Sequence, residues 1–198
     1  MKIENVHVWG LDESIQGAKF PMSVSPDQLT KELTPGIKKL MQSEKGEGHD
    51  QSLTGVQVMF DLTCSNKMWV EAERYRFLYF VSSQSTMHRI TKFNLKEQMN
   101  SYVWPETISK LETYAAAYNR LEDKASKTAK ELYLEILYNV PSGFELTARM
   151  TTNYRQLKTI YAQRKDHRLP EWREFCSWIE SLPMAYLITG DAAYEGRD

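Results

Sequence analysis

The chain has 198 residues, 41% of them hydrophobic and 12% aromatic, which is enough apolar material for one packed domain and excludes a disordered protein. Its 25 basic and 26 acidic residues leave a net charge of −1, so no overall field draws the protein to nucleic acid or to a membrane surface. The two cysteines lie far apart, and neither a signal peptide nor a membrane-spanning apolar run is visible. We therefore expect a cytoplasmic protein in a reducing compartment.

The first third of the chain is predicted to contain two strands separated by a helical stretch. Val6 to Leu11 has the pattern of a short strand, and a helical pattern extends from about 25 to 42 with an interruption at Pro35-Gly36. Residues 43–52 form a polar loop that contains glycine. From Val56 to Leu62 apolar and polar residues alternate, which predicts a strand with one buried face.

The middle of the chain combines one more strand with a long helical region. Asn66 is a candidate cap for a helix that ends at about Tyr75, and Phe77 to Val81 is predicted to be a buried strand. Residues 105–137 are rich in Ala, Leu, Glu and Lys. They predict either one long helix or two helices with a break near 119–123.

The last third is predicted to contain one strand and two helices. Phe144 to Met150 is the strand, Asn153 caps a helix that ends at about Arg164, and Glu171 to Leu182 forms the last clear helix. Strands and helices do not alternate strictly, which disfavours a doubly wound sheet. The expected fold is α+β, a single domain over residues 1–198 in which several helices pack against a small mixed or antiparallel sheet.

The segment Arg74-Tyr75-Arg76 is the most informative part of the sequence. Arginine presents a rigid fork of donors that suits phosphate and carboxylate. An apolar run follows the two arginines, and the small polar residues Ser83, Gln84 and Ser85 come next. This pattern indicates an anionic ligand at the edge of a core. The alternative for the tripeptide alone is a pair of arginines on a solvated face.

Another arginine, Arg164, lies on the apolar side of a predicted helix. Leu157, Ile160 and Tyr161 form one stripe, and Arg164 falls on the same face because seven residues are nearly two turns. An inward-facing arginine needs an anionic or polar partner. The alternative is that Arg164 extends to solvent at the helix end. Arg149 to Arg173 also form a basic segment, which suits a small anionic ligand.

Several common motifs are missing. The sequence has no glycine-rich phosphate loop, no dinucleotide fingerprint and no nucleophile elbow. Its histidines and cysteines do not show metal-ligand spacing, so no metal site is expected.

Taken together, four segments resemble the flavin-dependent thymidylate synthases. The hallmark of that family is Arg-His-Arg followed by about seven or eight residues and a Ser, and here Tyr75 replaces the His. The resemblance covers roughly residues 48–173. It rests on Arg74-Tyr75-Arg76 with Ser85, Gly48-His49-Asp50, Asn153-Tyr-Arg155-Gln-Leu157 followed by Arg164, and His167 with Glu171 and Arg173.

The resemblance implies an activity and a set of site residues. The expected reaction is methylation of dUMP to dTMP with FAD as cofactor and methylenetetrahydrofolate and NADPH as co-substrates, in a homotetramer with shared sites. Arg164 would activate the pyrimidine base. The implied FAD contacts are Arg74, Tyr75, Arg76, Asn153, Arg155, Thr159, His49 and His167. The implied nucleotide contacts are Glu71, Arg74, Ser83, Gln84, Ser85, Arg89 and Arg164.

The chain also departs from the family pattern, which leaves alternatives open. It could modify another pyrimidine nucleotide, or keep the fold without the reaction. A third possibility is a single-stranded nucleic-acid-binding module that uses its basic residues with Tyr154, Tyr161 and Trp172. The departures are Tyr75 for His, Gln51 for Thr, Glu71 for Gln, Ser83 for Glu, and Leu137 or Tyr138 where a phosphate-binding arginine is expected.

Overall fold

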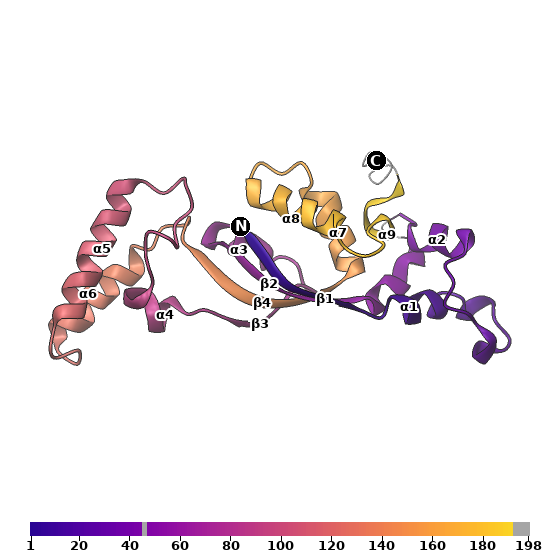
Figure 1. The fold of residues 1–198 in the computed structure, drawn as a ribbon, viewed down its shortest axis with the longest axis horizontal. Helices are drawn as coiled ribbons and strands as arrows, with labels where there is room; N and C mark the ends of the chain where they lie inside the picture. Colours follow the sequence, from indigo (N-terminus) through magenta and orange to yellow (C-terminus); the bar gives the residue numbers. More distant parts are fainter. Residues whose placement is uncertain (45–46, 192–198) are drawn as a thin grey trace.

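The computed structural model describes residues 1–44 and 47–191, and its centre is a four-stranded sheet. All three strand pairs are antiparallel, and the strand order is β1-β2-β4-β3 (Figure 1). The predicted α+β class is therefore confirmed, with an antiparallel sheet. The strands are β1 Lys2–Trp9, β2 Gln57–Ser65, β3 Tyr79–Ser83 and β4 Glu145–Asn153.

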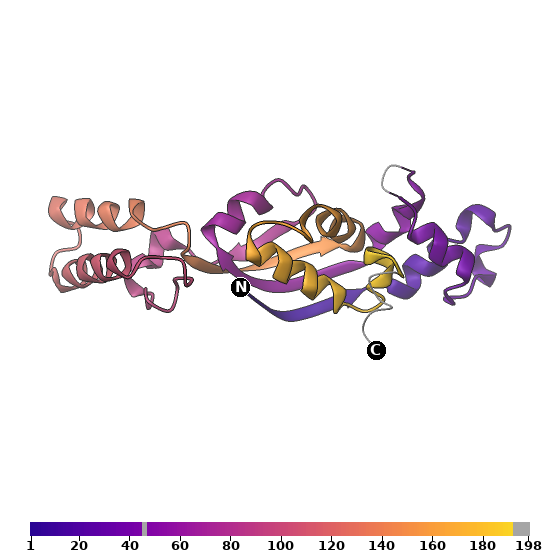
Figure 2. The ribbon, with the colours of Figure 1, turned by 90° about the horizontal axis from the view of Figure 1, so that it is seen from above.

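The helices lie over one face of the sheet and beyond its two ends. In Figures 1 and 2, α3, α7 and α8 cover one face, the α5–α6 hairpin extends from one end, and α1 and α2 lie at the other. The molecule is consequently elongated. The α-helices are α1 Leu11–Gly17, α2 Pro35–Met41, α3 Asn66–Ala72, α4 Thr86–Arg89, α5 Pro105–Arg120, α6 Lys127–Tyr138, α7 Tyr154–Arg164, α8 Pro170–Glu180 and α9 Tyr186–Thr189. The 3-10 turns are η1 Phe20–Met22, η2 Pro26–Gln28, η3 His49–Gly55 and η4 Ile90–Lys92.

Burial of alternate β2 residues fixes the helices to the sheet. Val58, Phe60, Leu62 and Cys64 are completely buried, as the period-two pattern predicts. The Phe60 ring lies 6.0 Å from that of Phe175 in α8 and packs in the main core. A second core lies between the α5–α6 hairpin and the end of the sheet. The site described below is built on the main core.

The three helix predictions for the second half of the chain are confirmed. The region 105–137 forms two helices, α5 and α6, α7 ends at Arg164, and the last predicted helix is α8, which ends at Glu180 instead of Leu182. Asn153 caps α7, since its Oδ1 atom accepts a hydrogen bond from the Gln156 N–H at 2.9 Å. Here local sequence signals and tertiary packing agree.

The prediction of a buried strand at 77–81 is wrong. The strand is β3, and every one of its residues is exposed in the single chain. Among the described strands β3 pairs with β4 alone, so it forms an edge of the sheet. Tyr79 pairs with Thr151, and the residue is 51% exposed. The apolar composition of the run indicated a strand but carried no information about which faces are covered.

Two predicted helices differ in their bounds. The pattern at 25–42 yields only η2 and the separate helix α2, because the proline at 35 favours an extended conformation in the residue before it. Thr34 caps α2. In the next helix the cap is Ser65, not Asn66, and α3 ends at Ala72, before the predicted Tyr75. Among the described residues, no helix is long and apolar enough to cross a membrane.

Candidate functional site

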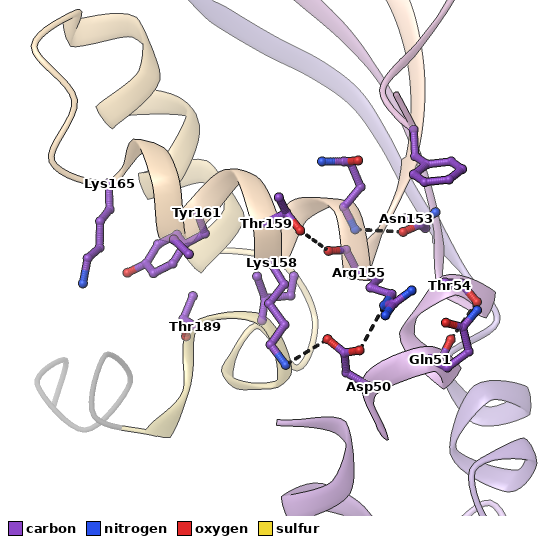
Figure 3. Close-up of a pocket in the computed structure, with 14 residues that line it drawn as sticks. Asp50, Gln51, Thr54, Asn153, Arg155, Lys158, Thr159, Tyr161, Lys165 and Thr189 are labelled. Atoms are coloured by element: carbon purple, nitrogen blue, oxygen red, sulfur yellow. Dashed lines mark hydrogen bonds and ion pairs between the residues drawn. The ribbon is translucent and has the colours of Figure 1, made fainter. Parts of the chain in front are cut away.

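The helix α7 carries candidate residues on two of its sides. Leu157 and Ile160 are completely buried and attach the helix to the sheet. On one side a cleft of about 690 Å³ extends along the helix between η3 and α9. Arg155, Thr159, Ala162 and Lys165 recur there at helical spacing and line the cleft (Figure 3).

The start of η3 places an acidic residue against this cleft. Gly48 adopts a φ of +78°, a conformation that glycine accepts without strain, and the chain then turns into His49 and Asp50. The Asp50 side chain is only 4% exposed. Figure 3 shows it between two cations of α7. The glycine of the Gly-His-Asp segment therefore serves to turn the backbone so that Asp50 faces the cleft.

Asp50 orients Arg155 and leaves the terminal nitrogens of the guanidinium free to bind a ligand. Its carboxylate accepts a hydrogen bond from Arg155 Nε at 2.9 Å and lies 3.3 Å from Lys158 Nζ. Lys158 also donates to the backbone carbonyls of Met41 and Ser43. Neither terminal nitrogen of Arg155 has a hydrogen-bond partner in the part of the chain that the structure describes. A buried carboxylate therefore holds the arginine through one edge while its outer edge can meet a ligand.

The structure brings three of the predicted flavin contacts together. Asn153, Arg155 and Thr159 all line the cleft along α7. His49 does not line it. The histidine is exposed and faces a neighbouring hollow between η3 and the helices α1 and α2, whereas Gln51, two residues later, lines both.

Arg164 projects from α7 toward α3 and α8, away from the cleft lining. Its Nε donates to the Tyr75 hydroxyl at 2.6 Å, and its Nη1 donates to Glu71 Oε2 at 3.0 Å. The guanidinium carbon lies 4.7 Å from the centre of the Trp172 ring. The sequence predicted that an inward arginine here needs an anionic or polar partner, and Glu71 and Tyr75 are those partners.

Two further groups complete the Arg164 cluster. The indole Nε1 of Trp172 donates to Glu71 Oε2 at 2.9 Å. His167 Nε2 lies 2.7 Å from Arg164 Nη1, and the Leu169 N–H points at its Nδ1 atom. A neutral imidazole has one nitrogen that accepts, so only one of these two contacts is a hydrogen bond in a given tautomer. We call Glu71, Tyr75, Arg164, His167 and Trp172 the Arg164 cluster.

Glu71 carries a negative charge in this cluster. Burial alone would raise the pKa of its carboxyl. Hydrogen bonds from Lys67 and Trp172 and the positive charges of Lys67 and Arg164 outweigh burial, so the pKa lies below its ordinary value. The Glu71 side chain is 18% exposed and that of Arg164 is 12% exposed, so the ion pair is mostly enclosed by protein.

The remaining predicted nucleotide and flavin contacts lie on the surface. Arg74 and Arg76 are exposed in the turn between α3 and β3, and Arg89 is exposed at the end of α4. None of the three forms an ion pair within the described ranges. Ser83, Gln84 and Ser85 lie at the end of the edge strand, where Gln84 Oε1 accepts a hydrogen bond from the Thr147 N–H at 3.0 Å. In the single chain these residues do not line the cleft along α7.

The segment after Arg164 has a clear structural role. Glu171 is buried, and its two carboxylate oxygens accept hydrogen bonds from the backbone N–H and the hydroxyl of Ser65, at 2.8 and 2.7 Å. Arg173 donates to the backbone carbonyls of His167 and Arg168. These contacts attach α8 to the β2–α3 junction, and they shape the loop that holds His167.

Several residues of the site were not predicted from the sequence. Lys158 and Lys165 line the cleft. Both follow Arg155 at positions on nearly the same helical face, so their spacing in the sequence could have predicted that they lie beside it. Trp172 was noted only as an aromatic residue in a basic segment. No local pattern indicates that its indole N–H reaches Glu71, 101 residues earlier in the chain. No cluster of His, Cys, Asp or Glu that could hold a metal occurs among the described residues.

Comparisons with known proteins identify the fold. Neither the comparison with protein-family models nor that with curated proteins gives a match. Among solved structures, the chain is similar to flavin dependent thymidylate synthase ThyX from Helicobacter pylori complexed with FAD and dUMP. The TM-score is 0.70 and the identity 17%, over 95% of this chain and 98% of that one.

A second crystal structure of thymidylate synthase X from Helicobacter pylori with FAD and dUMP gives a TM-score of 0.67 at 16% identity. It covers 95% of this chain and 97% of that one. The chain therefore has the fold of the flavin-dependent thymidylate synthases, with a sequence that has diverged far from these two structures.

Proposed function

We propose that the protein is an FAD-dependent enzyme of the thymidylate synthase type. It would methylate dUMP to dTMP with methylenetetrahydrofolate and NADPH as co-substrates. The observation that carries the proposal is the distribution of residues on α7. Asn153, Arg155 and Thr159, the positions of the flavin motif, line one cleft, and Arg164 extends from the same helix into a second polar cluster. The neighbours with this fold were crystallised with FAD and dUMP.

The cleft has the chemistry that a dinucleotide cofactor requires. Arg155 presents its two terminal nitrogens, and Lys165 lies further along the same helix without an ion pair in the described part of the chain (Figure 3). Together they offer separated positive charges for a pyrophosphate group. Phe77 and Ile188 add apolar surface for a ring system, and the Asn153 side chain lies at one end. The residues present thus fit FAD.

Arg164 is the residue we assign to the base. When bound, a reduced flavin supplies the hydride that converts the transferred one-carbon unit into a methyl group. Arg164 would donate a hydrogen bond to a carbonyl of the pyrimidine and stabilise the negative charge that develops on the ring. A reaction of this kind depends on positioning and electrostatics more than on a protein nucleophile, in agreement with the absence of a nucleophile motif.

The surface residues suggest how the site is completed. Five predicted ligand contacts do not line the cleft of their own chain, namely Arg74, Arg76, Ser83, Ser85 and Arg89. We propose that they serve ligands shared between subunits of a homotetramer. The exposed apolar residues of the β3 edge, Tyr79 and Val81 among them, are consistent with an interface there.

The nucleic-acid alternative has less support than the sequence suggested. Within the basic segment Arg149 pairs with Asp61, Arg155 and Lys158 pair with Asp50, and Arg164 pairs with Glu71. Four of the seven basic residues of the segment are therefore held by carboxylates of the same chain and are less available to a polyanion. We therefore propose no second function.

The test is a spectroscopic cycle on purified protein. We expect the absorbance spectrum of added FAD to change on binding, NADPH to bleach the flavin absorbance, and reoxidation under anaerobic conditions only when methylenetetrahydrofolate and dUMP are both present. Protein that leaves added FAD spectroscopically unchanged would refute the proposed function.

A further inference from the structure

Glu71 accepts a hydrogen bond from Arg164, the arginine that the proposed function assigns to the pyrimidine base. Of the three guanidinium nitrogens of Arg164, Nε contacts Tyr75, and Nη1 contacts both Glu71 and His167. The third nitrogen, Nη2, has no hydrogen-bond partner among the residues that the structure describes. Arg164 is therefore held from one side and retains one amino group for a ligand.

The charge of Arg164 is compensated within the protein. Glu71 lies 3.0 Å from it and faces the guanidinium from α3, whereas His167 and Trp172 approach from the α8 side. The other carboxylate oxygen of Glu71 lies 3.0 Å from Lys67 Nζ, and the Lys67 side chain is half exposed to solvent. An anionic ligand that approached Nη2 would also meet the Glu71 carboxylate a few ångströms away. An uncharged carbonyl oxygen would meet the same N–H donors without comparable repulsion.

Uncompensated arginines are available elsewhere on the same segment. Arg74 and Arg76 follow Glu71 by three and five residues, are exposed, and form no ion pair within the described ranges. A nucleotide has a charged phosphate end and an uncharged base end. Two kinds of arginine near one another, one compensated and the other not, can distinguish those ends.

We propose that Glu71 is a positioning residue that makes Arg164 select an uncharged carbonyl over an anion and so orients a pyrimidine nucleotide with its base toward Arg164. This inference rests on the proposed function for the identity of the ligand. The carboxylate acts through Arg164, which it fixes and compensates, and it repels the phosphate end. Where the family has Gln, an amide would fix the arginine equally well but would not repel an anion.

The test uses the Trp172 indole N–H as a reporter, because that group donates to Glu71. In the full chain labelled with ¹⁵N, its signal is assigned with Trp172→Phe and followed during titration with deoxyuridine and, separately, with inorganic phosphate. For wild type we expect deoxyuridine to move the signal and phosphate to leave it in place up to about tenfold higher concentration, a preference of roughly 1.4 kcal/mol.

The Glu71→Gln variant keeps an acceptor for Arg164 and Trp172 and removes the charge. We expect phosphate to bind at least about tenfold more tightly at the reporter than in wild type, while the deoxyuridine affinity changes less than about threefold. Lys67→Gln is the matched control, since it removes the other ion-pair partner of Glu71 without touching Arg164, and it should keep the wild-type preference. Melting curves establish that each variant is folded.

If Glu71→Gln does not fold, Arg164→Lys decides the question. This variant keeps the positive charge but loses Nη2, so deoxyuridine should no longer move the Trp172 signal. The inference is overturned if phosphate moves the wild-type signal as readily as deoxyuridine, if deoxyuridine leaves it in place, or if folded Glu71→Gln keeps the wild-type preference. None of these readouts uses flavin or turnover. A protein that takes up no FAD but shows the Glu71→Gln change therefore refutes the proposed function alone.

Discussion

The buried carboxylate of Asp50 lies 2.9 Å from Arg155 Nε and joins two segments that are 105 residues apart in the chain. The contact attaches η3 to α7 and sets the direction of the arginine at one wall of the cleft. Because Lys158 also approaches Asp50, one acidic group compensates two cations. The integrity of the cleft should therefore depend on this single carboxylate.

Replacement of Asp50 by Asn tests that dependence. The variant leaves Lys158 and Arg155 without their counter-ion, and we expect the free energy of unfolding to fall by about 3 kcal/mol. Urea unfolding measures the change. Asp166→Asn is the matched control, because Asp166 is exposed and forms no ion pair in the described part of the chain, and its effect should stay within about 0.5 kcal/mol. An Asp50→Asn protein as stable as the control would contradict the assignment.

Asn153 should have two roles that separate in two variants. Asn153→Ala removes the cap of α7 and should cost about 1 kcal/mol of stability. Asn153→Asp keeps an oxygen acceptor for the Gln156 N–H, so the protein should remain as stable as wild type. It adds a negative charge at the cleft, however, and should weaken FAD binding by about tenfold. Thermal melting and FAD titration measure the two effects. Equal FAD affinity in wild type and Asn153→Asp would exclude Asn153 from the flavin site.

Glu171 is expected to stabilise the fold. Glu171→Ala leaves the buried N–H and hydroxyl of Ser65 without their acceptor, and we expect a loss of roughly 2–3 kcal/mol in the free energy of unfolding. Glu174→Ala, at an exposed position one turn along α8, should cost less than about 1 kcal/mol. If the two variants melt at the same temperature, the structural role of Glu171 is wrong.

Acid should remove the contribution of one surface ion pair. Hydrogen bonds from Arg149 and Asn5 lower the pKa of Asp61 to about 2. The unfolded value is about 3.9. A carboxyl group with a lowered pKa stabilises the fold above its unfolded pKa and loses that contribution as the pH falls through the folded pKa. The difference in unfolding free energy between wild type and Asp61→Asn should thus be constant from about pH 7 to 5 and shrink between about pH 4 and 2. A difference that persists unchanged at the acid end would contradict this prediction.

Local patterns in the sequence predicted those parts of the fold that depend on nearby residues. The alternation in β2, the Asn153 cap and the position of Arg164 on the inner stripe of α7 are all confirmed. The sequence also required a polar partner for Arg164, but it did not predict that the charged one is Glu71, because 93 residues separate the two and only tertiary packing brings them together.

The errors have physical reasons too. An apolar run at β3 is compatible with a buried strand or with an exposed edge, and only the strand order of the sheet decides between them. Likewise, the cleft could not be predicted in full. Its walls come from η3, α7 and α9, so Gln51 and Thr189 meet there through folding alone, and His49 turns to the other side of η3.

Product analysis tests whether the chain converts dUMP to dTMP. Purified protein with FAD, NADPH, methylenetetrahydrofolate and dUMP should yield a product heavier than dUMP by one CH₂ group, detected by mass spectrometry. The Arg164→Ala protein, still able to bind FAD, should yield none. FAD-loaded wild-type protein that consumes NADPH but leaves dUMP unmethylated would contradict the claim.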